Sequence, residues 1–227
     1  VCSSDLVFLK YRVMYTNEVV IPMLDDGAHG DGAAGDGIFG ASIPAAASSP
    51  GQMIRYAILA VDTLSRTNRL PLFPDRLNSA EYFGTAVFNP AVTSSIPVLQ
   101  WFIKTPSGAE ADPGTQASIL YSGEFYDNVY VRIRGGTSRS WPKHSYKVEL
   151  TQDHEFLIHP GVGRVTEFDL NTTLGGDRES GGRTRPGRRY SLGKDGLPQC
   201  RICPAPLPGR PSGRPGAAPL SGFRSRV

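Results

Sequence analysis

The sequence has little of what usually assigns a chain to a function class. Its three cysteines, Cys2, Cys200 and Cys203, lie outside the regularly patterned part, so no disulfide framework is expected there. It contains no run of about 18 apolar residues, so no membrane-spanning segment is expected. Helical periodicity is absent before residue 173, which argues against a helical bundle and favours a mainly β fold.

Charge is divided unevenly along the 227 residues. The chain has 24 basic and 21 acidic residues, a net charge of +3. Residues 174–227 hold 11 Lys or Arg and three Asp or Glu, a net charge of +8, which leaves −5 for residues 1–173. Because the patterned part is acidic, it is not expected to bind nucleic acid. A nucleic-acid-binding function would depend wholly on the basic tail.

Both ends of the chain differ from the part between them. Residues 1–6, VCSSDL, resemble a translated sequencing-adapter tail and are expected to be an artefact. Residues 174–227 are dominated by Gly, Arg, Pro, Ala and Ser. Such a segment cannot bury enough apolar surface to offset its chain entropy, so disorder is expected. The abrupt change favours a shifted reading frame, with a genuine low-complexity tail as the alternative.

The patterned part divides into two β-rich units. Residues 7–64 show short strand patterns separated by turn signals, typical of an immunoglobulin-like β-sandwich. Within it, residues 53–62 carry apolar residues on both faces, which predicts a central strand. The proline-rich residues 65–95 are expected to be a connector with one strand at 81–88. Residues 96–173 form the second unit.

A loop in the first unit is rich in aspartate and glycine. Asp25, Asp26, Asp31 and Asp36 lie between glycines that permit tight turns. Carboxylates on such a loop suit Ca²⁺, although the spacing does not match an EF-hand. The alternative is a surface hairpin whose Asp side chains bond the local backbone, with His29 as an exposed structural residue. The stretch resembles the DDG…GD…AGDG segment of bacterial immunoglobulin-like modules.

The second unit contains a strand, a polar loop and a returning strand, at residues 127–150. Val129, Val131 and Ile133 share one face of the first strand, and Tyr146, Val148 and Leu150 share one face of the second. If both apolar faces point into one core, Arg132, Arg134, Lys147 and Glu149 lie on the opposite face and pair across the strands.

The loop of this hairpin offers a site for phosphate. Gly135, Gly136, Thr137 and Ser138 supply permissive backbone, amide groups and hydroxyls, and Lys143 and Lys147 supply positive charge. Consecutive amides with a nearby lysine suit a polyanion. The GxxxxGK[ST] spacing of a P-loop is absent, and a plain hairpin loop is the alternative.

The hairpin resembles the signature of CotH (spore coat protein H-like) kinases. The similar residues are Arg132–Ser138, RIRGGTS, and Pro142–Leu150, PKHSYKVEL, with weaker similarity at 96–99, 123–128 and 168–171. The resemblance covers about residues 96–173. It departs from the family at Gly136, where many relatives carry Asn, and at His144, where a second Lys is frequent.

The resemblance implies a secreted or surface-associated atypical kinase with an α+β fold, of which this chain holds the β-rich N-terminal part. The implied activity is phosphoryl transfer from ATP, with Mg²⁺, to a protein substrate that the sequence does not identify. Gly135–Ser138 correspond to the phosphate-side loop, and Lys147, with Lys143 second, to the lysine that grips the phosphates. The family's catalytic and metal-binding aspartates come after its first helices, so Asp169, Asp177 and Asp195 receive no role and the fragment is expected to be inactive.

Two further hypotheses come from the residues. A non-catalytic extracellular β-sandwich protein for adhesion or interaction, with Ca²⁺ bound at residues 25–36, is the alternative to the kinase. The CxxC spacing of Cys200 and Cys203 lacks the two further ligands that a zinc site needs, so no metal is expected there.

Overall fold

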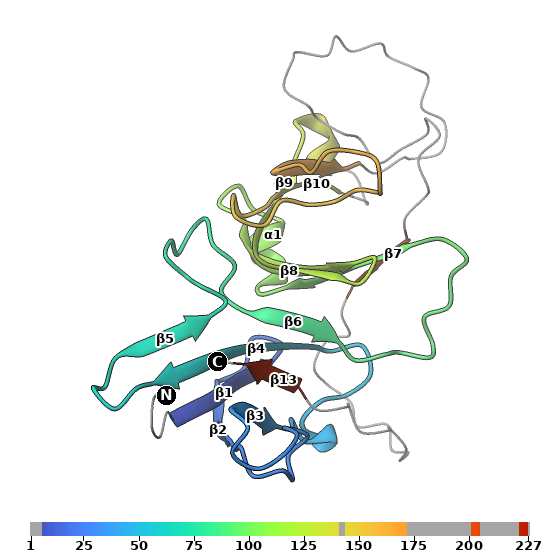
Figure 1. Cartoon of the computed structure of the whole chain (residues 1–227). Helices are drawn as coiled ribbons and strands as arrows, with labels where there is room; N and C mark the ends of the chain where they lie inside the picture. Colours follow the sequence, from blue (N-terminus) through green and yellow to red (C-terminus); the bar gives the residue numbers. More distant parts are fainter. Residues whose placement is uncertain (1–5, 141–143, 172–200, 205–222, 227) are drawn as a thin grey trace. The chain divides into compact units, whose positions relative to one another are not determined.

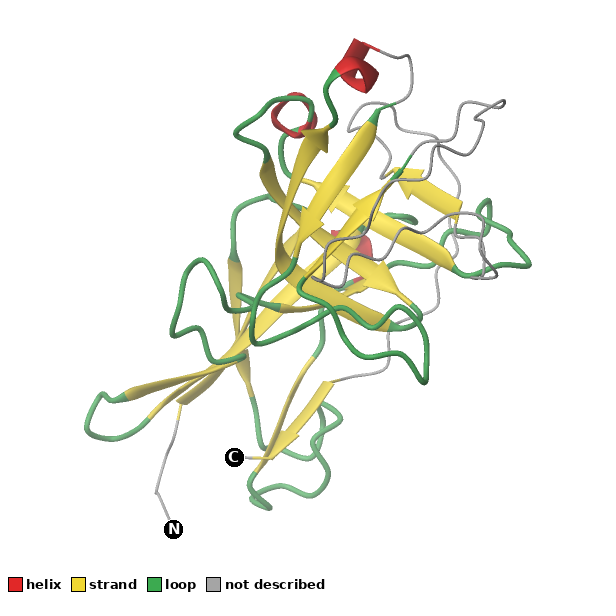
Figure 2. Ribbon diagram, turned by 90° about the horizontal axis from the view of Figure 1, so that it is seen from above, coloured by secondary structure: helices red, strands yellow, loops and turns green. Residues whose placement is uncertain are grey.

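The computed structural model describes residues 6–140, 144–171, 201–204 and 223–226, which are mainly β (Figure 1, Figure 2). The chain divides into two compact units. The first contains the described residues of 1–74, 81–92 and 205–227, and the second those of 75–80 and 93–204. Among the described residues, no helix is both long and apolar enough to cross a membrane.

The first unit is built on a five-stranded antiparallel sheet. Its strands are β1 (Leu6–Val13), β2 (Val19–Met23), β4 (Met53–Val61), β5 (Thr67–Leu70) and β6 (Phe83–Ala86). The order is β2-β1-β4-β5, and β6 pairs with the other end of β4. A separate two-stranded sheet joins β3 (Ile38–Ala41) to β13 (Phe223–Arg226), and Ala45–Ala47 form a 3₁₀ turn, η1.

Alternation along β1 and β4 explains the core of the first unit. Val7, Leu9 and Tyr11 are buried on one face of β1, as the period of two in a strand requires. Ile54 of β4 joins them, and Tyr56, Ile58 and Ala60 pack against the same cluster. Met53, Arg55 and Ala57 are buried on the opposite face of β4. The prediction of a central strand covered on both sides is therefore confirmed.

The segment at residues 65–95 contributes more than a connection. Residues 67–70 and 83–86 form β5 and β6, which both pair with β4. Pro71 follows β5 directly, and the prolines of this segment do not keep either short strand out of the sheet. Residues 75–80 belong to the second unit, so the chain passes between the units within this segment.

The second unit is a six-stranded sheet. It runs as an antiparallel meander through β7 (Val98–Ile103), β8 (Thr115–Tyr121), β9 (Glu124–Arg134), β10 (Ser145–Glu149) and β11 (Glu167–Leu170). β12 (Arg201–Pro204) pairs in parallel with β7 at one edge. A single helical turn, α1 (Pro106–Ala109), lies between β7 and β8, and Thr137–Ser140 form a 3₁₀ turn, η2, after β9.

The apolar faces predicted for the hairpin do meet in one core. Val129 and Val131 of β9 and Val148 of β10 are fully buried, and Ile133 is 4% exposed. Leu150 is buried in the same cluster, and Tyr146 packs against it. Phe156 and Phe168 stack on each other with ring centroids 4.5 Å apart, so residues 150–168 cover this face of the sheet.

Two local features shape β8 and β9. The turn between them has left-handed Ser122 (φ 50°) and Gly123 (φ 83°), as a two-residue hairpin of type I′ requires. The pairing register of β8 with β9 shifts between Ala117 and Ile119 of β8. Asn128 of β9 lies at this shift and has a positive φ of 55°. This β-bulge turns Asp127 into the interior, where it accepts a hydrogen bond from Ser118 Oγ at 2.8 Å.

Of residues 174–227, for which disorder is expected, the structure describes 201–204 and 223–226, as the strands β12 and β13. The remaining residues of this segment lie outside the described part. Of the adapter-like residues 1–6, residues 1–5 also lie outside it, and Leu6 is the first residue of β1.

Candidate functional site

The polar face of the β9–β10–β11 sheet carries the predicted cations in defined register. Lys147 of β10 lies opposite Arg132 of β9 and Asp169 of β11. Two residues further along β10, Glu149 lies opposite Tyr130 of β9 and Glu167 of β11. Alternation therefore places these charged side chains on the face opposite the core.

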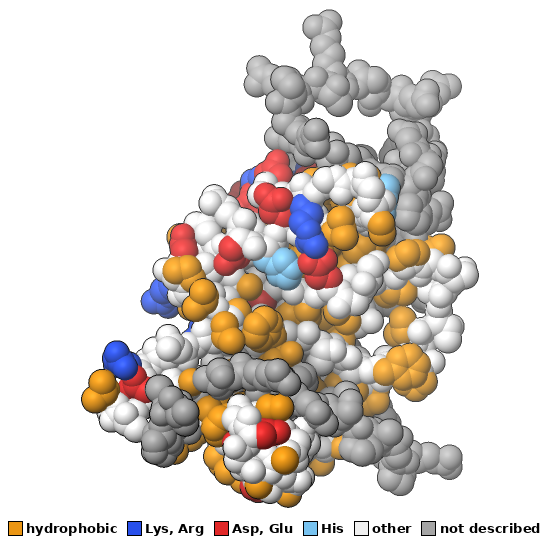
Figure 3. Space-filling view, viewed as in Figure 1, with side chains coloured by type: hydrophobic (Ala, Val, Ile, Leu, Met, Phe, Trp, Pro, Cys, Tyr) orange, Lys and Arg blue, Asp and Glu red, His pale blue; other side chains and the backbone are white. Residues whose placement is uncertain are grey.

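Ion pairs connect these side chains. Lys147 Nζ lies 2.6 Å from Glu149 Oε1 and 2.7 Å from Glu167 Oε2. Arg132 lies 3.9 Å from Glu149, and Arg134 lies 3.0 Å from Asp169. The predicted pairing across the strands is confirmed, and Asp169 has a structural contact. In Figure 3, basic side chains lie directly beside acidic ones on the surface in view.

Lys147 remains positively charged under physiological conditions. Burial lowers the pKa of the Lys147 ammonium, but hydrogen bonds with Glu149 and Glu167 outweigh burial and raise its pKa above the ordinary value. The side chain is 22% exposed, so an incoming anion can reach it. The three cations of this face are neutralised by three carboxylates, those of Glu149, Glu167 and Asp169. A polyanion that binds here must therefore displace carboxylates from the cations.

The predicted phosphate loop follows β9 directly. Gly135 has a φ of 102°, which favours glycine, and no atom lies within 4 Å of a Cβ built on Gly136. η2 then closes the first turn, with the amide of Arg139 donating to the Gly136 carbonyl at 3.2 Å. The structure gives Thr137 and Ser138 a backbone position only, and Lys143 lies outside the described residues.

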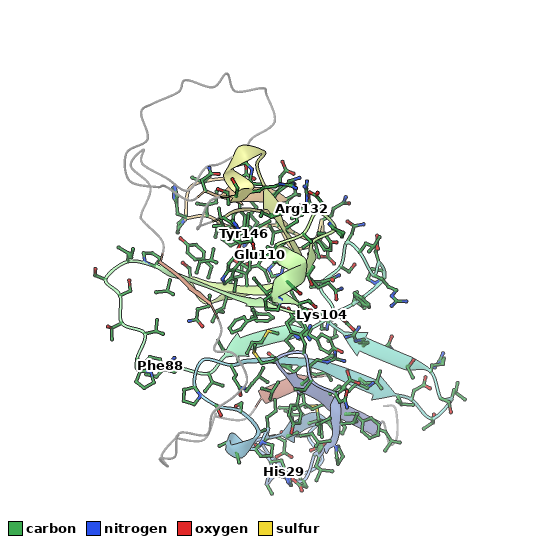
Figure 4. The ribbon with its side chains drawn as sticks, turned by 180° about the vertical axis from the view of Figure 1, so that it is seen from behind. His29, Phe88, Lys104, Glu110, Arg132 and Tyr146 are labelled. Atoms are coloured by element: carbon green, nitrogen blue, oxygen red, sulfur yellow. The ribbon has the colours of Figure 1, made fainter. Side chains whose placement is uncertain are left out.

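Two acidic residues after α1 hold this loop, and the sequence analysis missed both. Asp112 pairs with Arg139 at 2.5 Å, and this hydrogen bond lowers the pKa of the Asp112 carboxyl. Glu110 bonds to both His144 Nδ1 and the Tyr146 hydroxyl, and Figure 4 shows Glu110 and Tyr146 next to each other. In the sequence, Glu110 and Asp112 look like residues of any polar turn. Only the pairing of the strands shows that they contact Tyr146 and Arg139.

An open hollow of about 400 Å³ lies on the same polar face. Its lining residues come from β8, β9, β10, the residue that follows β10 and the segment 75–80. They are Leu77, Asn78, Gln116, Asn128, Tyr130, Glu149 and Leu150. Since Glu149 both lines the hollow and pairs with Lys147, the hollow adjoins the predicted phosphate-binding cation.

The aspartates of the first unit bond the backbone of their own loop. The Asp31 carboxylate is buried and accepts from the amides of Asp26 at 2.6 Å, Gly27 at 2.7 Å and His29 at 2.9 Å. The bond from the Gly27 amide is the main reason that the pKa of Asp31 lies below its ordinary value. Asp25 accepts from three amides, those of residues 35–37.

The other two aspartates are engaged in the same way. Asp36 accepts from the amides of Ala33 at 3.2 Å and Ile38 at 2.9 Å. Asp26 accepts from the Ala28 amide and pairs with His29 Nδ1 at 2.9 Å, a hydrogen bond that raises the pKa of His29. These bonds match the hairpin alternative, and calcium binding stays a prediction.

A metal site needs several ligating side chains close together. Within residues 6–140, 144–171, 201–204 and 223–226, no group of three or more His, Cys, Asp or Glu could hold a metal ion. Asp177, Asp195, Cys2 and Cys200 lie outside these ranges, and of Cys203 only the backbone is described.

A further polar cluster, not found from the sequence, surrounds Glu124. Its carboxylate accepts from the Tyr126 hydroxyl at 2.6 Å and from Arg164 at 2.8 Å, and lies 2.8 Å from His154 Nε2. Burial raises the pKa of Glu124, but the hydrogen bonds from Arg164, Tyr126 and His154 outweigh it and lower the pKa to about 2. The cluster ties the β8–β9 turn to residues 154–164.

Comparison with known proteins identifies the first unit only. The family model of the second Ig-like domain of conditioned medium factor matches residues 8–59. This range covers β2, β3 and most of β1 and β4, together with the aspartate-rich loop. The first unit therefore contains an Ig-like module. No curated protein and no solved structure gives a significant match to the chain.

Proposed function

We propose that the second unit is the nucleotide-binding part of a CotH-like protein kinase and that this chain binds ATP on the polar face of β9 and β10. The observation that carries the proposal is the position of Lys147. Its ammonium is charged, partly exposed and in register with Arg132 on a strand that leads away from the glycine-containing loop. Paired cations beside exposed backbone amides are the groups that bind a triphosphate.

The described residues fit the phosphates of ATP better than they fit the metal. Arg132, Arg134 and Lys147 would hold the phosphate oxygens, and the turn at Gly135 permits close approach of the backbone. The ion Mg²⁺ prefers several oxygen ligands, and no suitable cluster occurs within the described ranges. The proposal for this chain is therefore nucleotide binding, and phosphoryl transfer to a protein belongs to the complete kinase that the resemblance implies.

The first unit supports an extracellular location for the proposed kinase. It contains an Ig-like module, and the matching family takes its name from a factor of conditioned medium. We propose that the protein is secreted or exposed at a cell surface, with the Ig-like module as an accessory domain.

A titration with a fluorescent ATP analogue tests the proposal. We expect saturable binding by the whole chain and at least a tenfold loss of affinity in Lys147→Ala, because the variant removes one of the charges that meet the phosphates. Lys10→Ala is the matched control, since Lys10 is also a partly buried strand lysine that pairs with a glutamate, Glu18 at 3.0 Å. Absence of saturable binding, or equal loss in both variants, would refute ATP binding at this face.

A non-catalytic extracellular interaction protein is the second candidate, favoured by the Ig-like match. In that case, calcium at Asp25, Asp26, Asp31 and Asp36 would stabilise the loop of residues 25–37. The carboxylates would have to exchange backbone amides for the ion. A rise in melting temperature with Ca²⁺ that is reversed by a chelator, together with no ATP binding, would select this candidate over the kinase.

A further inference from the structure

The hollow on the polar face has walls that are fixed before any ligand binds. Asn128 lies at the β-bulge, and its side-chain amide donates to the carbonyls of Arg76 and Ser79, both at 2.9 Å. The Ala80 amide donates to Asp153 at 3.3 Å. These bonds hold residues 75–80 against the sheet, and Leu77 from this segment forms one wall of the hollow.

Tyr130 offers an aromatic surface in the hollow. The residue is 37% exposed, and its hydroxyl donates to the Pro113 carbonyl, which fixes the ring. A planar heterocycle can stack on an exposed ring of this kind without a specific hydrogen-bond pattern. Leu77 is 83% exposed and supplies further apolar surface that a ligand would cover.

Glu149 is the charged group of the hollow. It lies directly opposite Tyr130, and its carboxylate pairs with Lys147. Ionised carboxylates accept hydrogen bonds but do not donate them, so Glu149 suits sugar hydroxyls and repels phosphate. The hollow therefore fits the uncharged half of a nucleotide better than the charged half.

The register of β9 and β10 orders these groups along the face. The pair Tyr130 and Glu149 comes first, Arg132 and Lys147 second, and Arg134 and Ser145 third, followed by Gly135. Tyr130 and Gly135 are five residues apart on an extended strand, or about 17 Å. An extended nucleoside triphosphate spans a comparable length.

We infer that the hollow is the nucleoside subsite of this chain: the base of ATP stacks on Tyr130, the ribose hydroxyls bond to Glu149, and the triphosphate runs past Arg132 and Lys147 toward Gly135. The inference rests on the proposed function and adds the direction of the nucleotide along the strands and a role for Tyr130, Arg132 and Glu149. Figure 4 labels Arg132 in the same part of the second unit as Glu110 and Tyr146.

Splitting the ligand into its two halves tests this direction. Adenosine, inorganic tripolyphosphate and ATP are each titrated into the whole chain by calorimetry. We expect Tyr130→Ala to weaken adenosine and ATP at least fivefold and to leave tripolyphosphate unchanged, because only the stacking surface is lost. Arg132→Ala is expected to weaken ATP and tripolyphosphate at least fivefold and to leave adenosine unchanged.

Two further variants separate stacking from folding. Tyr130→Phe keeps the ring but loses the bond to Pro113, so it should bind adenosine within about twofold of the wild type. Phe88→Ala removes an aromatic residue that is 78% exposed in the first unit and should change none of the three affinities.

The outcomes separate the inference from the proposed function. If Lys147→Ala weakens ATP binding but Tyr130→Ala does not, the nucleoside subsite is refuted and ATP binding at this face stands. If Tyr130→Ala weakens tripolyphosphate as much as adenosine, the subsite is refuted as well. If the wild type binds neither ATP nor tripolyphosphate, the proposed function fails and the inference fails with it.

Discussion

At the scale of single residues, Glu124 couples the stability of the second unit to pH. Its pKa of about 2 in the folded chain lies below the ordinary value of 4.5, chiefly because Arg164, Tyr126 and His154 outweigh the effect of burial. A depressed carboxyl pKa stabilises the fold above about 4.5, and this contribution is lost as the pH falls toward 2. Glu124→Gln should therefore be less stable than the wild type at pH 7. It should also lose less stability than the wild type as the pH falls from about 4.5 to about 2.

Urea unfolding at several pH values measures this effect. The chain has two tryptophans, Trp101 and Trp141, and Trp101 is buried in the second unit. In a Trp141→Phe background, Trp101 fluorescence therefore follows this unit alone. Glu155→Gln is the control, because the bond from Arg164 to Glu155 goes to its backbone oxygen. Parallel pH curves for the Glu124 variant and the wild type would contradict the assignment.

At the scale of elements, the aspartate-rich loop depends on its contact with β3. Gly40 exchanges both backbone hydrogen bonds with Leu24, and a Cβ at Gly40 would lie 2.3 Å from the His29 carbonyl oxygen. Backbone cannot yield as a flexible side chain does, so Gly40→Ala should displace the loop and lower the melting temperature of the first unit by several degrees.

Gly136→Ala is the matched control for this substitution, since it also adds one methyl group to a loop or strand end and meets no atom within 4 Å. Amide hydrogen exchange gives the local readout, with faster exchange expected at the amides of Gly27 and His29 only in the Gly40 variant. Unchanged exchange there would show that β3 does not hold the loop.

The elements also show how far the sequence could lead. The strand predicted at residues 53–62 is β4, and the first strand of the hairpin predicted at 127–150 is the C-terminal part of β9. β5 was missed because Thr67–Leu70 is short and polar, and only its pairing with β4 stabilises it. Sequence reasoning also found the charged face of the hairpin, since the period of two in a strand fixes it.

Other parts of the site depend on contacts between residues far apart in the chain. Glu110 meets Tyr146 across 36 residues, and Asn128 meets Ser79 across 49. No local pattern announces such contacts, because turn residues like Glu110 are polar wherever they occur. The hollow likewise arises only when residues 75–80 fold onto the β-bulge.

At the scale of the whole molecule, each unit has its own hydrophobic core, and the positive net charge is confined to residues 174–227. Among the described side chains, every member of both cores lies between Val7 and Leu170. The described residues after Asn171 are β12 and β13, which add backbone pairing to β7 and β3. Residues 174–227 carry a net charge of +8, and residues 1–173 carry −5.

Removal of residues 172–227 should therefore change charge far more than folding. We expect the shortened chain to keep the buried environment of Trp101 and a cooperative unfolding transition, because hydrophobic burial stabilises each unit more than one pair of edge strands does. Affinity of the whole chain for a DNA duplex, if measurable, should disappear on truncation, since an acidic chain releases few counterions from DNA. Loss of cooperative unfolding would instead show that β12 and β13 complete the two sheets, and retained DNA binding would place a basic surface within the folded units.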